Sequence, residues 1–210
     1  ARLDEACTVI RSLFRETKSS FKGRYYQLED ASLEPKPVQN PLPLLIGGGG
    51  EQVTLKITAR HADEWNVWGT PETLAHKMAI LDGHCRDLGR DPREIRRSAV
   101  ALLFMSEDPA YLARMRAAKL QQASLIGTTE EIRARVAEYE RIGVDELIVP
   151  DFTLGDMAQK TATLDRFSGG RDGTLWYYRA ITDAMGRNFD HWLVDELARA
   201  VDEMHRIGRS

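Results

Sequence analysis

Short apolar runs alternate with segments of helical periodicity from residue 44 to residue 167. Four of these runs predict strands, at residues 44–46, 64–68, 98–105 and 146–152. Each run is followed by apolar residues three and four positions apart, which is the spacing of one face of a helix. This order favours right-handed crossovers and a parallel sheet covered by helices. It is compatible with an open doubly wound sheet and with part of an eight-stranded (β/α) barrel.

Capping residues support the predicted helices. Thr and Asp are favoured at the residue before a helix, and Pro is favoured at its first position. Such residues precede three of the predicted helices: Thr70 with Pro71, Asp108 with Pro109, and Thr128 with Glu131. The last pair has the spacing of a capping box and predicts an extra helix over residues 128–142, which ends at Gly143.

The remaining segments differ from this pattern. Residues 3–14 and 51–60 have the spacing of helices, whereas residues 21–43 contain four prolines and predict a small hairpin or an extended excursion. After residue 168 a glycine-rich stretch leads to two helical patterns with no strand between them. We therefore divide the chain into an α/β part over residues 1–168 and a helical extension of unknown role over residues 169–210.

Composition excludes several classes of function. The chain has 29 Lys and Arg against 32 Asp and Glu, so no basic excess points to nucleic acid or to an anionic membrane. The longest apolar stretch, PLPLLIG, is far shorter than the roughly 20 residues of a membrane span. We expect a cytoplasmic protein. The two cysteines, Cys7 and Cys85, stand at apolar positions of predicted helices, and we interpret them as reduced core residues.

The best signal of a binding site is a run of four glycines, Gly47 to Gly50, which follows the apolar run ending at Ile46 and precedes a helix. Without Cβ atoms the backbone can approach a phosphate, and the N-terminus of a helix offers unpaired N–H groups. No Gly-Lys-Ser/Thr follows, so the segment is not a Walker loop. The alternative interpretation is a plain tight turn.

The end of the next predicted strand, Trp65 to Trp68, is a second candidate for ligand contact. In parallel α/β folds, side chains at this end of a strand contact ligands. An aromatic ring there could stack on a flat ligand, and the amide of Asn66 could form a hydrogen bond to it. Core packing is the alternative. At the opposite end of this strand, we interpret Asp63 as a turn residue.

The histidines on the predicted helices lie away from the strand ends and lack HxxxH or HxH spacing, so we interpret them as solvated or structural: His76, His84, His191 and His205. We predict no metal site. No GxSxG motif appears, and no paired carboxylates stand at successive strand ends. The residues themselves therefore assign no catalytic group.

Three segments carry a resemblance to a known family: FKGRYYQLEDASLEPKPVQNPLPLLIGGGGEQVTLKITARHADEWNVWG, PETLAHKMAILDGHCRDLGRDPREI and GTTEEIRARVAEYERIGVDELIVPDF. They resemble luciferase-like monooxygenases, in particular the branch that uses the deazaflavin coenzyme F420. The resemblance implies a (β/α) TIM barrel in which Ile46, Gly47, Gly48, Gly49 and Gly50 hold the cofactor phosphate. It places Asn66 beside the cofactor ring and Trp68 beside the substrate.

The resemblance covers only four of the eight strands, all from the second half of such a barrel, and the stretch after residue 168 departs from it. Because the first half supplies many catalytic side chains in that family, no catalytic residue is assigned. We expect an oxidoreductase that transfers hydride or activates oxygen at F420, with FMN as the alternative, on a small-molecule substrate. The competing hypothesis is a noncatalytic half-barrel that pairs with another chain. In either case we expect a homo-oligomer or a complementing half-barrel.

Overall fold

The computed structural model describes residues 2–150 together with residues 158, 159 and 199. The predicted helical extension over 169–210 and the predicted helix after residue 152 therefore lie outside the described part of the chain, apart from these isolated positions. His191 and His205 lie outside it as well.

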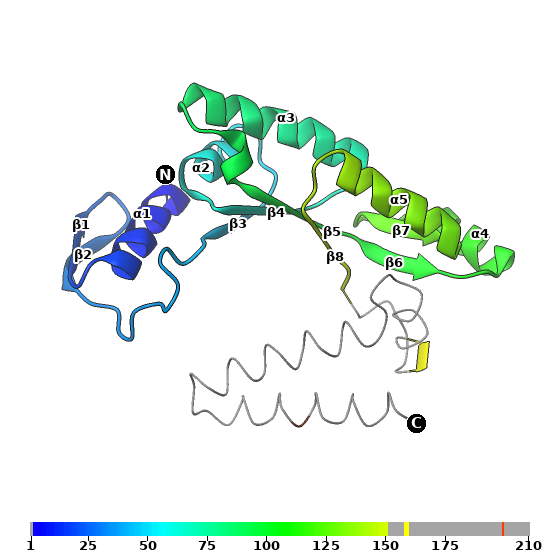
Figure 1. The fold of residues 1–210 in the computed structure, drawn as a ribbon, viewed down its shortest axis with the longest axis horizontal. Helices are drawn as coiled ribbons and strands as arrows, with labels where there is room; N and C mark the ends of the chain where they lie inside the picture. The colour runs from blue at the N-terminus through cyan, green and yellow to red at the C-terminus, as the bar shows by residue number, and fades with distance from the viewer. Residues whose placement is uncertain (1, 151–157, 160–198, 200–210) are drawn as a thin grey trace.

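Helices and strands alternate through most of the described chain (Figure 1). In chain order they are α1 (Arg2–Arg15), β1 (Ser19–Lys22), β2 (Gln27–Ala31), β3 (Leu45–Gly47), α2 (Thr54–His61), β4 (Glu64–Trp68), α3 (Pro71–Asp87), the 3-10 turn η1 (Pro92–Glu94), β5 (Arg96–Val100), β6 (Leu102–Met105), α4 (Pro109–Ala117), β7 (Ser124–Gly127), α5 (Thr129–Arg141) and β8 (Glu146–Ile148).

The central sheet has four parallel strands in the order β3-β4-β5-β8, and α3 and α5 lie on the same side of the strands (Figure 1). Trp65 of β4 stands beside Ile46 of β3 and Arg97 of β5. Its buried side chain belongs to the main core, which the helices cover. The predicted α/β fold with a parallel sheet is confirmed.

One predicted strand is wrong in its extent. The run over residues 98–105 forms two strands, β5 and β6, with Ala101 between them. Ala101 N donates to Ile148 O (3.1 Å), and Leu102 N donates to Ala123 O (2.9 Å). The backbone N–H of Ala101 thus points to β8, whereas that of Leu102 points to the residue before β7. The strand pairing therefore changes at this point. Its second half pairs in parallel with β7, a four-residue strand that the sequence analysis did not predict.

The helix predicted over residues 51–60 begins later, at Thr54, after a turn over residues 51–53. The carbonyl of Glu51 lies 2.9 Å from Nε2 of His84, and Leu55 N donates to Gly50 O instead of to Glu51 O. The backbone of Glu51 is therefore bound to α3, which delays the start of α2.

The predicted caps and core cysteines are confirmed. Asp108 Oδ1 accepts from Ala110 N at 2.9 Å, and both hydrogen bonds of the capping box between Thr128 and Glu131 are present. The side chain of Thr70 accepts from the backbone N–H of Thr73. Cys7 and Cys85 are free thiols buried in α1 and α3. Burial raises the pKa of both thiols, which keeps them in the neutral form that suits a core.

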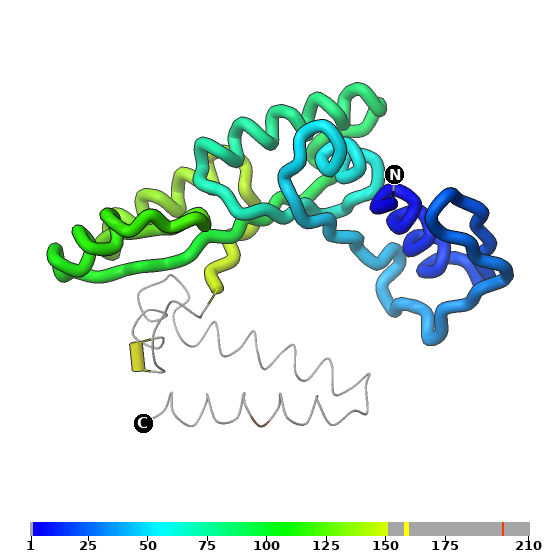
Figure 2. The backbone as a smooth tube through the Cα atoms, turned by 180° about the vertical axis from the view of Figure 1, so that it is seen from behind, coloured from blue at the N-terminus to red at the C-terminus, as the bar shows by residue number. Residues whose placement is uncertain are grey.

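The predicted hairpin is also present, as the antiparallel pair β1 and β2. The carboxylate of Glu5 in α1 accepts hydrogen bonds from the backbone of Arg24, Tyr25 and Tyr26, which tie the hairpin turn to this helix. Seen from behind, α1 and the hairpin lie at one end of the molecule, and α4 with β6 and β7 lies at the other (Figure 2). None of the described helices is long and apolar enough to cross a membrane.

Candidate cofactor site at the carboxyl end of the sheet

The four glycines lie where β3 ends. Ile46 is buried between α1 and α2, and Gly47 stands beside Asn66 in the sheet. Gly48 N donates to Asn66 O at 2.9 Å, which is the last hydrogen bond between the two strands. Gly48 then has a φ of +118°, a backbone conformation that favours glycine. The chain leaves the sheet at this residue and turns towards α2.

Four successive carbonyl groups of this loop, those of residues 48–51, accept hydrogen bonds from the surrounding scaffold. The donors are Trp65 Nε1 to Gly48 O (2.8 Å), Lys77 Nζ to Gly49 O (2.7 Å), Leu55 N to Gly50 O (2.9 Å) and His84 Nε2 to Glu51 O (2.9 Å). They come from β4, α2 and α3. Each carbonyl oxygen is thus directed to the protein.

The N–H groups of the same peptides have the opposite direction. In a trans peptide the N–H of one residue points away from the C=O of the residue before it, and the peptides that follow residues 48–51 are trans. Within the described residues, the N–H groups of Gly49, Gly50, Glu51 and Gln52 have no hydrogen-bond acceptor. A row of such donors at the N-terminus of a helix is chemically suited to an anion such as phosphate.

The glycine side of the loop is closely packed. A Cβ atom at Gly49 would lie 3.1 Å from the Lys77 side chain and 3.2 Å from Cγ2 of Val67. At Gly50 it would lie 2.9 Å from Oγ1 of Thr54. Side chains at these positions would crowd the scaffold that holds the loop. The missing side chains therefore let the loop pack against α3 and β4, and the residues present fit a cradle whose N–H groups, at residues 49–52, are left for a ligand.

Asn66 and Trp68 lie on the face of β4 opposite to Trp65, because side chains alternate along a strand. The amide Nδ2 of Asn66 donates to Oγ of Ser98 on β5 (2.9 Å). This bond fixes the orientation of the Asn66 amide on the strand next to Gly47. Trp68, at the end of the strand, is 40% exposed. Core packing, the alternative for these aromatic residues, therefore holds for Trp65 and fails for Trp68.

Two residues that contact the loop were missed as site residues. Lys77 is not singled out by the sequence pattern. His84 is interpreted from that pattern as solvated or structural, and the contact of His84 with the Glu51 carbonyl confirms a structural role. The available signal was their spacing, since residues seven positions apart lie on one face of a helix. That spacing does not reveal which neighbour the face meets.

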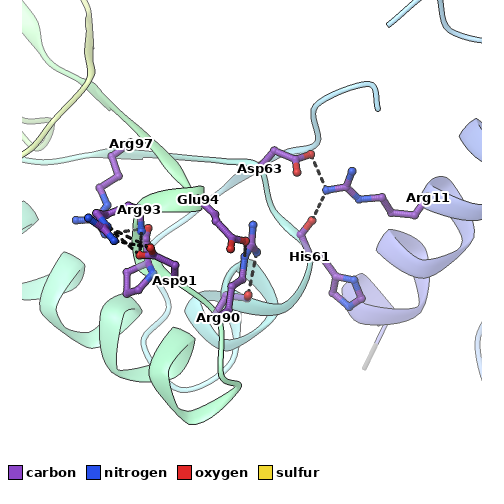
Figure 3. A network of polar contacts seen from close by, with 10 residues as sticks. Arg11, His61, Asp63, Arg90, Asp91, Arg93, Glu94 and Arg97 are labelled. Atoms are coloured by element: carbon purple, nitrogen blue, oxygen red, sulfur yellow. Dashed lines mark hydrogen bonds and ion pairs between the residues drawn. The ribbon is translucent and has the colours of Figure 1, made fainter. Parts of the chain in front are cut away.

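Asp63 lies at the opposite end of β4, as expected, but it is more than a turn residue (Figure 3). Its Oδ2 accepts from Arg11 Nη2 (2.5 Å) and from Leu44 N (2.6 Å), and Arg11 Nη2 also donates to His61 O (2.7 Å). This carboxylate joins α1 to the start of β3. In the described part of the chain no three His, Cys, Asp or Glu side chains gather as a metal site would require.

Comparisons with known proteins identify the family and the fold of the chain. The family model for luciferase-like monooxygenases matches residues 1–118. The chain belongs to this family. It is 33% identical over 113 residues to an F420-dependent glucose-6-phosphate dehydrogenase of Kineococcus radiotolerans, a match that covers 52% of this chain and 33% of that protein. It is 23% identical over 188 residues to an FMNH(2)-dependent dimethylsulfone monooxygenase of Pseudomonas putida, with coverage of 70% and 52%.

The luciferase-like fold is also found in the structural comparison. Coenzyme F420 dependent tetrahydromethanopterin reductase from Methanopyrus kandleri matches with a TM-score of 0.61 and 14% identity, over 75% of this chain and 59% of that one. The predicted partial (β/α) TIM barrel is thus confirmed. The chain spans between a third and about half of the length of the two curated relatives.

Proposed function

We propose that this chain is the cofactor-phosphate half of a luciferase-like oxidoreductase that uses coenzyme F420, with FMN as the alternative. The observation that carries the proposal is the row of unpaired N–H groups at residues 49–52, held by four bound carbonyls. Such a row binds a phosphate group without requiring a cationic side chain. Both cofactors carry a phosphate group in the tail that leads to their ring.

When bound, either cofactor supplies the redox chemistry, which is hydride transfer or, with a reduced flavin, the activation of oxygen. The residues of this chain bind the cofactor and orient it towards the substrate. The loop that follows β3 holds the phosphate through the N–H groups of residues 49–52, and Asn66, fixed by Ser98, contributes a hydrogen-bonding group beside the ring. Trp68 offers an exposed aromatic surface to the substrate.

The choice of F420 over FMN rests on the relatives. The relative with 33% identity is named as F420-dependent, and the one named as FMNH(2)-dependent has 23% identity. An F420-dependent hydroxymycolic acid dehydrogenase of Mycobacterium tuberculosis has 27% identity over 109 residues. We therefore expect tighter binding of F420.

Equilibrium titration of the 210-residue chain with F420 and with FMN, followed by cofactor fluorescence, tests the proposal. We expect saturable binding of F420, weakened by a Gly49→Asp substitution. Tighter binding of FMN would reverse the choice of cofactor. Failure to bind either one at millimolar concentration would overturn the cofactor site. Cofactor binding without turnover of any dehydrogenase or monooxygenase substrate would favour a noncatalytic binding module.

A further inference from the structure

The face of α3 that meets the glycine loop carries Lys77 and His84, seven residues apart. The ammonium group of Lys77, on a side chain that is only 20% exposed, lies 2.7 Å from Gly49 O and 3.2 Å from the carboxylate of Glu51. Since a carbonyl oxygen can only accept, Nε2 of His84 is the donor in its contact with Glu51 O. Two side chains of one helix thus bind two carbonyls of the loop.

We propose that Lys77 and His84 are positioning residues, which set the affinity of the loop for phosphate by fixing the direction of its peptides. This inference rests on the proposed cofactor site. Each carbonyl that α3 binds directs the next N–H, that of Gly50 or of Gln52, away from the scaffold. Without these bonds the loop, with glycine at four successive positions, has many other peptide orientations. Phosphate binding would then have to order the loop.

A second role of Lys77 is electrostatic, and the two roles can be separated. Glu51 places a carboxylate beside the loop, and the ammonium of Lys77 compensates its charge at 3.2 Å. Nε2 of His76, on a largely exposed side chain, lies 3.4 Å from the same carboxylate. Removing Lys77 alone changes both the geometry and the charge. Removing Lys77 together with Glu51 restores the charge balance but not the hydrogen bond to Gly49 O.

The test uses the ¹⁵N-labelled 210-residue chain, with inorganic phosphate and then F420 as probes. Chemical-shift changes of the amides of residues 49–52 report binding at the loop and give a dissociation constant. We expect Lys77→Met and His84→Phe each to raise this constant about tenfold. Lys77→Arg and His84→Gln retain a donor and are expected to stay within about threefold of wild type.

Two controls and one replacement variant complete the experiment. Arg86→Gln removes a charge from the exposed surface of the same helix and should leave the constant unchanged. The double variant Lys77→Met with Glu51→Gln should remain about tenfold weaker, because its Gly49 carbonyl is still unbound. Lys77→Leu, which also lacks a donor, replaces Lys77→Met if thermal melts show that the latter does not fold.

The possible results are distinct. Full recovery of affinity in the double variant would overturn the positioning role in favour of a charge effect. Wild-type affinity in both single variants that lack the donor, Lys77→Met (or Lys77→Leu) and His84→Phe, would overturn it as well. If both probes leave the amides of residues 49–52 of the wild-type chain unshifted, the phosphate site itself is wrong, and no role for α3 in phosphate binding survives. Amide shifts with F420 but not with inorganic phosphate would retain the site, and the variants are then compared with F420.

Discussion

The indole Nε1 of Trp65 donates to the carbonyl of Gly48 at 2.8 Å, so a core side chain of β4 fixes the first peptide of the loop that follows β3. The ring is 1% exposed and packs in the main core beneath the helices. The hydrophobic core and the candidate cofactor site therefore share a residue. This coupling means that loop geometry depends on core packing as well as on the glycines.

Replacing Trp65 by Phe should weaken both stability and cofactor binding. Phe retains most of the apolar ring but leaves Gly48 O without its donor, a loss of about 1–3 kcal/mol in the free energy of unfolding. Urea unfolding followed by circular dichroism measures this loss, and F420 titration measures binding. Trp68→Phe, at the exposed end of the same strand, is the control and should change stability by no more than about 0.5 kcal/mol. Equal stability of the two variants would contradict the coupling.

The link between Arg11 and Asp63 should stabilise the attachment of α1 (Figure 3). Arg11→Met removes the hydrogen bonds to the Asp63 carboxylate and to His61 O. We expect a loss of about 1–3 kcal/mol, since hydrogen bonds to charged groups are at the strong end of the range. Urea unfolding is the measurement, and Arg15→Met, exposed on the same helix, is the control. A loss of the same size in the control would show that the link contributes nothing of its own.

The ion pair of Glu72 with Arg135 should make stability depend on pH in the acidic range. Arg135 donates to both oxygens of the Glu72 carboxylate, at 2.8 Å each, and joins the start of α3 to α5. These hydrogen bonds, with one from Thr70, lower the pKa of Glu72 to about 2. Because the folded pKa is lowered, the contribution is present above the ordinary pKa of about 4.5 and is lost as the pH falls towards about 2.

Glu72→Gln tests this dependence. The difference in unfolding free energy between wild type and variant should be small, since the pair is solvent-exposed, and should vanish near pH 2. In an Arg135→Gln background the same substitution should lose most of this pH dependence, because the main donor that lowers the pKa of Glu72 is then absent. A difference that stays constant from about pH 6 to about pH 2 would exclude the carboxylate of Glu72 as its source.

Local features of the sequence predicted the elements well, because their causes are local. The strand over residues 64–68 and the caps at Asp108 and Thr128 depend on side chains within a few residues of each other. The break at Ala101 depends instead on which strands lie beside it, and an apolar run does not encode its neighbours. The glycines of the candidate site were found for the same local reason.

The contacts that hold the loop could not be found in this way, although Trp65 itself stands in a stretch that the sequence singles out. Trp65, Lys77 and His84 reach it from positions 17 to 33 residues away in the chain. Their role depends on how α3 packs over β4, which is a property of the tertiary structure. A lysine and a histidine on a helix, taken alone, have many solvated counterparts in other proteins.

The chain should associate with itself. Three apolar side chains on one face of the sheet are exposed: Leu45 (49%), Trp68 (40%) and Ile148 (37%). Leu45 and Ile148 lie on β3 and β8, the outer strands of the four-stranded sheet as far as the structure describes it. Exposed apolar groups and open strand edges favour pairing.

Size-exclusion chromatography with light scattering at several concentrations measures this association. Leu45→Lys with Ile148→Lys should move the equilibrium towards monomer. Lys36→Ala, outside this sheet, should not. A wild-type chain that is monomeric at every concentration and unfolds cooperatively would contradict the prediction.

The charge of a side chain at Gly49 should decide cofactor affinity. Because a Cβ at Gly49 meets the Lys77 side chain, the carboxylate of Gly49→Asp competes with Gly49 O for the Lys77 ammonium and adds a negative charge to the phosphate site. We expect the F420 dissociation constant to rise at least about tenfold, which is about 1.4 kcal/mol. Gly49→Asn is the matched control, because its Cβ meets the same atoms of Lys77 and Val67 as that of Gly49→Asp. Steric crowding is therefore common to the two variants, and the difference between their F420 dissociation constants isolates the charge. If the loop is only a tight turn, the two variants bind F420 equally, because no bound anion then lies near residue 49.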